Sequence, residues 1–342
     1  MCTPDATYSF RALPKRGEIM RRPEFNSPFA AEMNHYLDDR VATGFQEHSF
    51  YGELRKFDRF CCEEKIITTI FTEESANRWL RRTTDEATTT HYHRINGSKQ
   101  FLIYLKKKGY DVFVIRDIRF RPTDFQPHIY TKEQTQRYFL ALDSYTNCKN
   151  KKAEIQYPVL FRILYCCGSR LNETLGIRKM DVDLDNGIIK LFETKNNCER
   201  YIVLSDELSG LMRQFANKCF YLLADNDYIF TSRTGKRISG KQVYGVHRMC
   251  LKKAGIPYIG NGLGPRVHDW RHTMAVGSFK QMVDSGLDMY VALPILSTYL
   301  GHKTIFATEK YVRLTMQIYP HIEEKFRTSV DFIFGGLADE NN

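Results

Sequence analysis

The stretch LSTYLGHKTIFATEKYVRL, residues 296–314, combines a histidine and a tyrosine at a separation that calls for an explanation. A Leu-Gly-His turn ends at His302, and Tyr311 follows nine residues later. This spacing predicts that His302 lies in a loop and Tyr311 on the next helix, so that both side chains reach one ligand from different elements. Gly301 is suited to the tight turn because it lacks a side chain. Thr308 lies one helical turn before the tyrosine. Two roles are open for it, a hydrogen bond to a backbone carbonyl or a phosphate, and packing, of which we favour packing.

Two further segments place arginine beside acid or histidine. CGSRLNETLGI has Arg170 and Glu173 three residues apart, which predicts neighbours on one helix face. HDWRHTMA has His268 and Arg271 at the same spacing. Each guanidinium offers a planar fork of donors that matches phosphate oxygens. These segments therefore predict a phosphate-binding site.

A hairpin adds one more cation. The β-rich segments GIIKLFET and RYIVLS flank KNNCE, which predicts two antiparallel strands with Lys195 at the tip. Alone, each of these motifs also fits a plainer interpretation, such as a surface ion pair or a core tyrosine. Trp270 is interpreted as core and His272 as structural.

In this order, the motifs resemble the tyrosine recombinases, which include lambda-type and conjugative-transposon integrases and Xer-type recombinases. The resemblance spans residues 131 to about 320 and is carried by Arg170, Glu173, Lys195, His268, Arg271, His302 and Tyr311. It implies a mainly α fold with a small antiparallel β-sheet. It also implies two domains, a helical core-binding domain and a mixed α/β catalytic domain.

The resemblance implies a site-specific DNA recombinase that cuts and rejoins DNA, for integration or excision of a mobile element. Arg170 and Arg271 would bind the non-bridging oxygens of the scissile phosphate, and His302 would donate a hydrogen bond to it. Tyr311 would attack as the nucleophile and form a 3′-phosphotyrosyl bond.

The remaining motif residues have supporting roles in this implied mechanism. Lys195 would protonate the leaving 5′ oxygen, and His268 would help remove the proton of the tyrosine. Glu173 would orient the cluster. No cofactor or metal is expected, since the arginines supply the charge. Cys61, Cys62, His91 and His93 lack zinc-ligand spacing.

Composition favours the same class of partner. The 342-residue chain carries a formal net charge of +10, which favours a polyanion such as DNA. No apolar run approaches the ~20 residues of a membrane span. The nine cysteines include no C-x-x-C pair and fit reduced thiols in the cytoplasm. We expect no signal peptide, since the first residues lack an apolar core, and no folded arm-site domain ahead of the first predicted helix.

We expect five segments along the chain. They are a basic N-terminal tail (1–25), a helical core DNA-binding domain (26–115), a linker (116–130), the catalytic domain (131–317) and a C-terminal tail helix (318–342). The tail has apolar residues at helical spacing, and the resemblance implies that it docks in trans on a neighbouring copy.

By resemblance, double-stranded DNA is the partner, and a monomer in solution becomes a homo-tetramer on synapsed recombination sites. Two alternatives stay open. A type IB topoisomerase shares the nucleophile and the cationic pocket but relaxes DNA without exchange. A non-catalytic DNA-binding relative would keep the fold and lose the chemistry.

Overall fold

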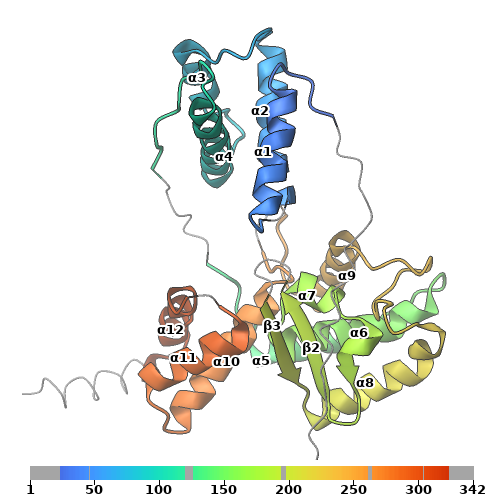
Figure 1. Ribbon diagram of the computed structural model, residues 1–342. Coiled ribbons are helices and arrows are strands. Elements are labelled where there is room, and N and C mark those ends of the chain that lie inside the picture. The colour runs from blue at the N-terminus through green and yellow to red at the C-terminus, as the bar shows by residue number, and fades with distance from the viewer. Residues whose placement is uncertain are drawn as a thin grey trace, which may run out of the picture. The chain divides into compact units, whose positions relative to one another are not determined.

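The computed structural model describes residues 24–45, 47–119, 126–193, 198–260, 264–302 and 304–322. The predictions on the basic tail, on Lys195 at the hairpin tip and on most of the C-terminal tail lie outside these ranges. The chain divides into two compact units, Met1–Phe125 and Gln126–Asn342 (Figure 1).

The first unit is all helical in its described part. Its helices are α1 (Ala30–Ala42), α2 (Glu47–Glu63), α3 (Glu73–Leu80) and α4 (Thr88–Lys107). The helical domain expected over residues 26–115 thus contains four helices in its described part. Thr72 is the N-cap of α3, and its side chain accepts from the backbone N–H of Ser75 at 3.2 Å. Aromatic rings fill the core, with Phe29, Phe57 and Phe101 fully buried.

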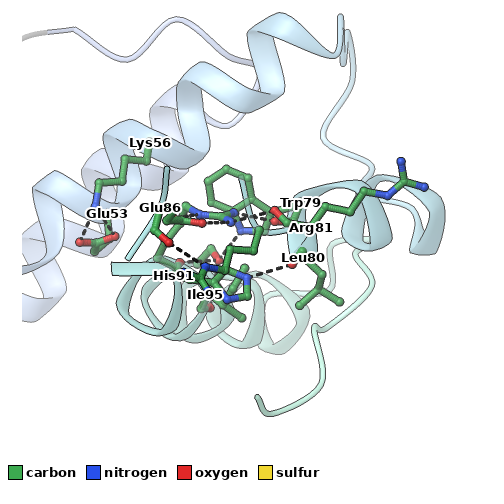
Figure 2. Close-up of polar contacts among 11 residues, drawn as sticks. Glu53, Lys56, Trp79, Leu80, Arg81, Glu86, His91 and Ile95 are labelled. Atoms are coloured by element: carbon green, nitrogen blue, oxygen red, sulfur yellow. Dashed lines mark hydrogen bonds and ion pairs between the residues drawn. The ribbon is translucent and has the colours of Figure 1, made fainter. Parts of the chain in front are cut away.

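A buried ion pair ties the α3–α4 connection to this core. Arg94 on α4 meets both carboxylate oxygens of Glu86, at 2.8 and 2.9 Å. It also donates to the backbone carbonyls of Trp79 and Arg81, at 2.6 and 3.2 Å. In Figure 2, dashed lines mark these contacts between Glu86 on one side and Trp79 and Arg81 on the other, and the side chain of Arg81 points away from them. The connection therefore has a fixed path over α4.

The second unit combines helices with a small sheet. Its elements are α5 (Lys132–Asp143), α6 (Lys151–Cys166), α7 (Leu171–Leu175), η1 (Lys179–Asp181), β1 (Val182–Asp183), β2 (Ile188–Glu193), β3 (Cys198–Val203), α8 (Asp206–Cys219), η2 (Phe220–Leu222), α9 (Gly240–Lys253), α10 (Asp269–Asp284), α11 (Met289–Leu300) and α12 (Phe306–Ile318). The mainly α fold with a small antiparallel sheet is confirmed. Thr131 starts α5 with a capping box to Gln134, as such a sequence favours.

The sheet has the strand order β1-β2-β3, and all neighbours are antiparallel. The predicted hairpin is β2–β3, with Ile188 opposite Val203. Strand β1 is an addition that the sequence pattern did not predict. Ile189, Leu191 and Ile202 are buried on one face, so the hairpin packs on the core through alternate residues.

Helices α10, α11 and α12 contact one another and form a second core in this unit (Figure 1). Trp270, at the start of α10, is fully buried and stacks on Tyr130 with centroids 3.8 Å apart, which confirms it as a core residue. Ile322, from the start of the C-terminal tail, is fully buried in the cluster of α10–α12. The first residues of the tail therefore pack on their own unit.

In the described residues, no helix is both long enough and apolar enough to span a membrane.

Candidate active site

Arg170 and Glu173 form the first part of the site. Arg170 is the N-cap of α7, and its backbone N–H donates to Oε2 of Glu173 at 2.8 Å. Its Nη1 donates to Oε1 of the same carboxylate at 2.7 Å. The pair is therefore close, but the expectation that both residues lie on one helix face is wrong, because Arg170 has extended backbone angles and precedes the helix.

A second arginine, Arg200 on β3, holds the same carboxylate. Its Nη1 and Nη2 donate to the two oxygens of Glu173 at 3.0 and 2.7 Å. Burial raises the pKa of Glu173, but the hydrogen bonds and charges of Arg200 and Arg170 outweigh burial and lower it. Sequence reasoning missed Arg200. The available signal was strand alternation, which puts Arg200 on the inward face with Ile202, where a lone charge needs a partner.

Arg271 lies near the start of α10 and is only 2% exposed. Its Nη1 donates to the carbonyl of Gly168, and its Nη2 to that of Leu300, each at 2.6 Å. Arg170 reaches the next carbonyl of the same turn, Gly301, at 3.2 Å. The Leu-Gly-His turn thus brings both arginines of the predicted phosphate site together.

Two glycines allow the turns that bring these arginines and backbone carbonyls together. Gly301 ends α11 with φ +67°, and a Cβ there would lie 3.1 Å from Nη1 of Arg200. Gly168 has φ +58°, and a Cβ there would lie 3.0 Å from the sulfur of Met274. The tight turn predicted at Gly301 is confirmed, and both positions favour glycine on conformation and on space.

The two motif arginines lie close enough to interact electrostatically. Burial, followed by the charge of Arg170, lowers the pKa of Arg271 to about 10. Like charges held together at a buried site disfavour each other unless an anion lies between them. The site is therefore built to receive a negatively charged group.

His302 follows the glycine of the turn. Its Nε2 lies 3.0 Å from Nη2 of Arg271, and its Nδ1 lies 2.7 Å from Oγ1 of Thr308. Burial and the neighbouring arginines, Arg271 first, lower the pKa of His302 to about 4, so the ring is neutral near pH 7. Thr308 is fully buried, as a packing residue should be, and it also makes this polar contact.

Tyr311 lies on α12 with its ring nearly parallel to that of His302, at 9° and 6.1 Å between centroids. It is 1% exposed. Burial raises the pKa of its hydroxyl, although Arg271 and Arg170 oppose this change. Lys310 lies beside it, with Nζ 5.1 Å from the centroid of the tyrosine ring. In this structure Tyr311 is protonated and lies within the cationic cluster.

The histidine that contacts the tyrosine hydroxyl is His272, with Nδ1 2.9 Å from the phenolic oxygen. His268 lies one ring further away, 4.7 Å from His272 between centroids. Burial and nearby charges lower the pKa of His268 to about 4 and that of His272 to about 2. Both rings are therefore neutral, and the residue interpreted as structural is the one in contact with the hydroxyl.

Six of the seven motif residues thus meet at one site, from the ends of α7, α10 and α11 and from α12. The seventh, Lys195, lies outside the described residues. Arg200 is on the strand that follows Lys195, five residues later, and its bond to Glu173 links the hairpin to the arginine pair.

Residues 133–317, more than half of the chain, match the model of the phage integrase family. The protein belongs to this family, and its resemblance to the tyrosine recombinases is confirmed. The integrase/recombinase y4rB of Sinorhizobium fredii is 27% identical over 296 residues, covering 84% of this chain and 93% of that protein. Tyrosine recombinase XerC of Staphylococcus saprophyticus is 23% identical over 285 residues, covering 81% and 90%.

Solved structures show the same fold. A pre-cleavage complex of the site-specific recombinase XerH with its difH substrate has a TM-score of 0.61 at 17% identity, covering 82% of this chain and 81% of that chain. A lambda integrase dimer bound to a COC′ core site has a TM-score of 0.57 at 16% identity, covering 82% and 76%. The two-domain architecture of these recombinases is therefore the architecture of this chain.

Proposed function

We propose that this protein is a site-specific DNA recombinase that cuts and rejoins DNA through a 3′-phosphotyrosyl intermediate. The observation that carries the proposal is the position of the Tyr311 hydroxyl, in one buried site with Arg170, Arg271 and His302. The names of its relatives, which include recombinases bound to DNA, agree with this substrate. The net charge of +10 favours the same partner.

The arginines would stabilise charge on the phosphate. A phosphodiester oxygen that enters between Arg170 and Arg271 relieves the repulsion between the two guanidinium groups. The carbonyls of Gly168 and Leu300 fix the plane of Arg271 before the DNA arrives. Such fixed donors stabilise the pentacoordinate transition state without reorganising during the reaction.

In the chemical step, the Tyr311 oxygen forms a bond to phosphorus while the bond from phosphorus to the 5′ oxygen breaks. The phenolic proton goes to a histidine, with His272 nearest and His268 next to it. Lys195, in the role that the family resemblance gives it, donates a proton to the leaving oxygen. Attack of a 5′-hydroxyl on the phosphotyrosyl bond reverses the step and rejoins the strand.

This exchange conserves the energy of the phosphodiester in the covalent link, so it needs no nucleotide cofactor. Strand exchange requires two duplexes, and we include a homo-tetramer on synapsed sites in the proposal. The biological role that we propose is integration or excision of a mobile element.

The test is covalent capture on DNA. The probe is a pool of duplexes with random sequence and a nick beside the cleavage position, so that a released short fragment leaves the protein trapped. The wild type should form an adduct, and Tyr311→Phe should bind the same duplexes without forming one. Tyr299→Phe, which removes a half-buried hydroxyl from α11, is the matched control and should behave as wild type.

An adduct with Tyr311→Phe would show that another residue is the nucleophile. Absence of any adduct with the wild type, across the pool, would contradict the proposed function itself.

A further inference from the structure

The contacts of His302 fix where its proton lies. Arginine N–H groups only donate, so the Nε2 atom that faces Nη2 of Arg271 at 3.0 Å must accept. A neutral imidazole then carries its proton on Nδ1. That N–H donates to Oγ1 of Thr308, 2.7 Å away. In this structure His302 therefore accepts on the side of the arginine and donates on the side of α12.

This arrangement does not yet suit a phosphate. Phosphate oxygens accept hydrogen bonds, and the proposed role of His302 needs a proton on Nε2. A second proton on the ring is disfavoured, because burial and the charges of Arg271 and Arg170 lower its pKa to about 4. The Thr308 hydroxyl, 2.7 Å from Nδ1, makes the other neutral tautomer available, in which Nε2 donates and Nδ1 accepts.

We propose that Thr308 is a positioning residue whose hydroxyl lets His302 change from hydrogen-bond acceptor to donor when a DNA phosphate enters the site. The inference rests on the proposed function. A hydroxyl can accept from Nδ1–H before binding and donate to bare Nδ1 afterwards. When a phosphate oxygen replaces Arg271 as the partner of Nε2, one proton leaves Nδ1 to water and one arrives at Nε2 from water, with no net change.

The placement of Thr308 fits this role. Its side chain is fully buried, and its backbone N–H donates to the carbonyl of Ile305 at 2.8 Å, in the first turn of α12. Its branched side chain has restricted rotamers, which hold the hydroxyl toward the ring. Tyr311 lies three residues later on the same helix, so one rigid element aligns both the nucleophile and the proton position of His302.

The first arm of the test reads the tautomer directly and needs no DNA. Nitrogen NMR of histidine-labelled protein distinguishes a protonated from a bare ring nitrogen. The wild type should show His302 with a proton on Nδ1 and a bare Nε2, and Thr308→Ser should keep this state. Thr308→Val removes both donor and acceptor at nearly the same volume. Without DNA it should keep the proton on Nδ1, because Arg271 still donates to Nε2, and it should lose only the change to the donor form, which the second arm measures. A wild-type ring protonated at Nε2 would overturn the proposal.

The second arm measures the rate of covalent adduct formation on a duplex recovered from the capture experiment. Thr308→Val should slow it by about 10²-fold, the range for loss of one transition-state donor. Thr308→Ser should restore it to within about threefold. The matched control is Thr315→Val on the same helix, which is equally buried but bonds only the carbonyl of Tyr311, at 2.6 Å. It should stay within about threefold of wild type.

A double-mutant cycle separates this role from a merely structural one. In a His302→Ala background, Thr308→Val should cost less than about twofold, since its effect passes through His302. If the rate losses of the two single variants multiply in the double variant, the proposal is overturned. If the wild type forms no adduct on any duplex, the proposed function is contradicted. The NMR measurement needs no DNA, so it still tests the hydrogen bond between Thr308 and His302.

Discussion

Single residues outside the recognised motifs complete this site. Arg200 gives Glu173 its second ion pair, and a carboxylate only 4% exposed needs such partners. His272 contacts the hydroxyl of Tyr311, and Thr308 contacts His302. Each of these side chains acts on a motif residue. The positions of the motif side chains therefore depend on neighbouring residues that the motif pattern does not include.

His247 carries a prediction about acid stability. It lies on α9 with 1% exposure, 2.8 Å from the Tyr138 hydroxyl through Nδ1, and burial lowers its pKa from 6.5 to about 4. The folded state therefore binds fewer protons than the unfolded state between these values. The contribution of neutral His247 to the free energy of unfolding is complete above about pH 6.5, and it is lost as the pH falls to about 4. This one residue accounts for about 3 kcal/mol of that loss.

Urea unfolding at pH 7, 5.5 and 4.5 measures this dependence. His247→Gln cannot titrate, so its free energy of unfolding should fall less steeply with acid than that of the wild type. Some slope should persist, because the pKa values of His268, His272 and His302 are lowered in the same sense. Parallel curves for the two proteins would rule out His247 as a source of the acid sensitivity.

Among the secondary-structure elements, charged side chains fix the path of connections whose residues have no strong preference for one conformation. The α3–α4 connection contains Arg81 and Glu86 and has no apolar run that would direct its path. Arg94 directs it, by pairing with Glu86 and by binding the carbonyls of Trp79 and Arg81. The guanidinium also lies 4.2 Å from the Trp79 ring centroid, a cation–π contact.

Arg94→Met should therefore destabilise the first unit by about 3 kcal/mol, since it leaves the carboxylate of Glu86, whose side chain is only 10% exposed, without its partner. The matched control is Lys56→Met on α2, which breaks the exposed pair with Glu53 that Figure 2 also shows. That change should cost less than about 1 kcal/mol. Urea unfolding followed by the fluorescence of Trp79 compares the two. Similar losses in both variants would mean that burial does not decide the strength of the Arg94 pair.

For the whole molecule, we expect assembly to depend on the C-terminal tail. The described part ends at Ile322, which is buried in the cluster of α10–α12. Beyond it, the sequence places Phe326, Val330 and Phe334 at intervals of four residues, as on one face of a helix. We propose that this apolar face binds a neighbouring copy on synapsed DNA.

Replacing Phe326, Val330 and Phe334 with serine should weaken synapsis at least about tenfold, because apolar anchors dominate such interfaces. Affinity for a single duplex should stay within about twofold. Energy transfer between two labelled duplexes measures synapsis, and fluorescence anisotropy measures single-site binding. The control replaces Lys325, Thr328 and Asp331, the polar positions of the same segment, with serine. Equal losses in synapsis and in single-site binding would indicate that the tail packs on its own chain.

The local elements and the motif residues of the site could be predicted from the sequence alone, whereas Arg200 and the contact of His272 could not. The spacing from His302 to Tyr311 predicted a loop and then a helix, and the β-rich segments on either side of Lys195 predicted the hairpin. Thr72 and Thr131 are residues of the type that favours helix starts, and each is an N-cap. These features depend on neighbours within a few residues, which is the range over which caps, turns and hydrophobic periods act.

Only the tertiary structure decided which side chains touch. It put Arg170 ahead of its helix rather than on it, paired Glu173 with Arg200, and set His272 instead of His268 against Tyr311. It also joined Thr308 to His302. These contacts are made where α7, β3, α10, α11 and α12 converge. Their distances follow from how helices and sheet pack, and a linear pattern of residue types carries no record of that packing.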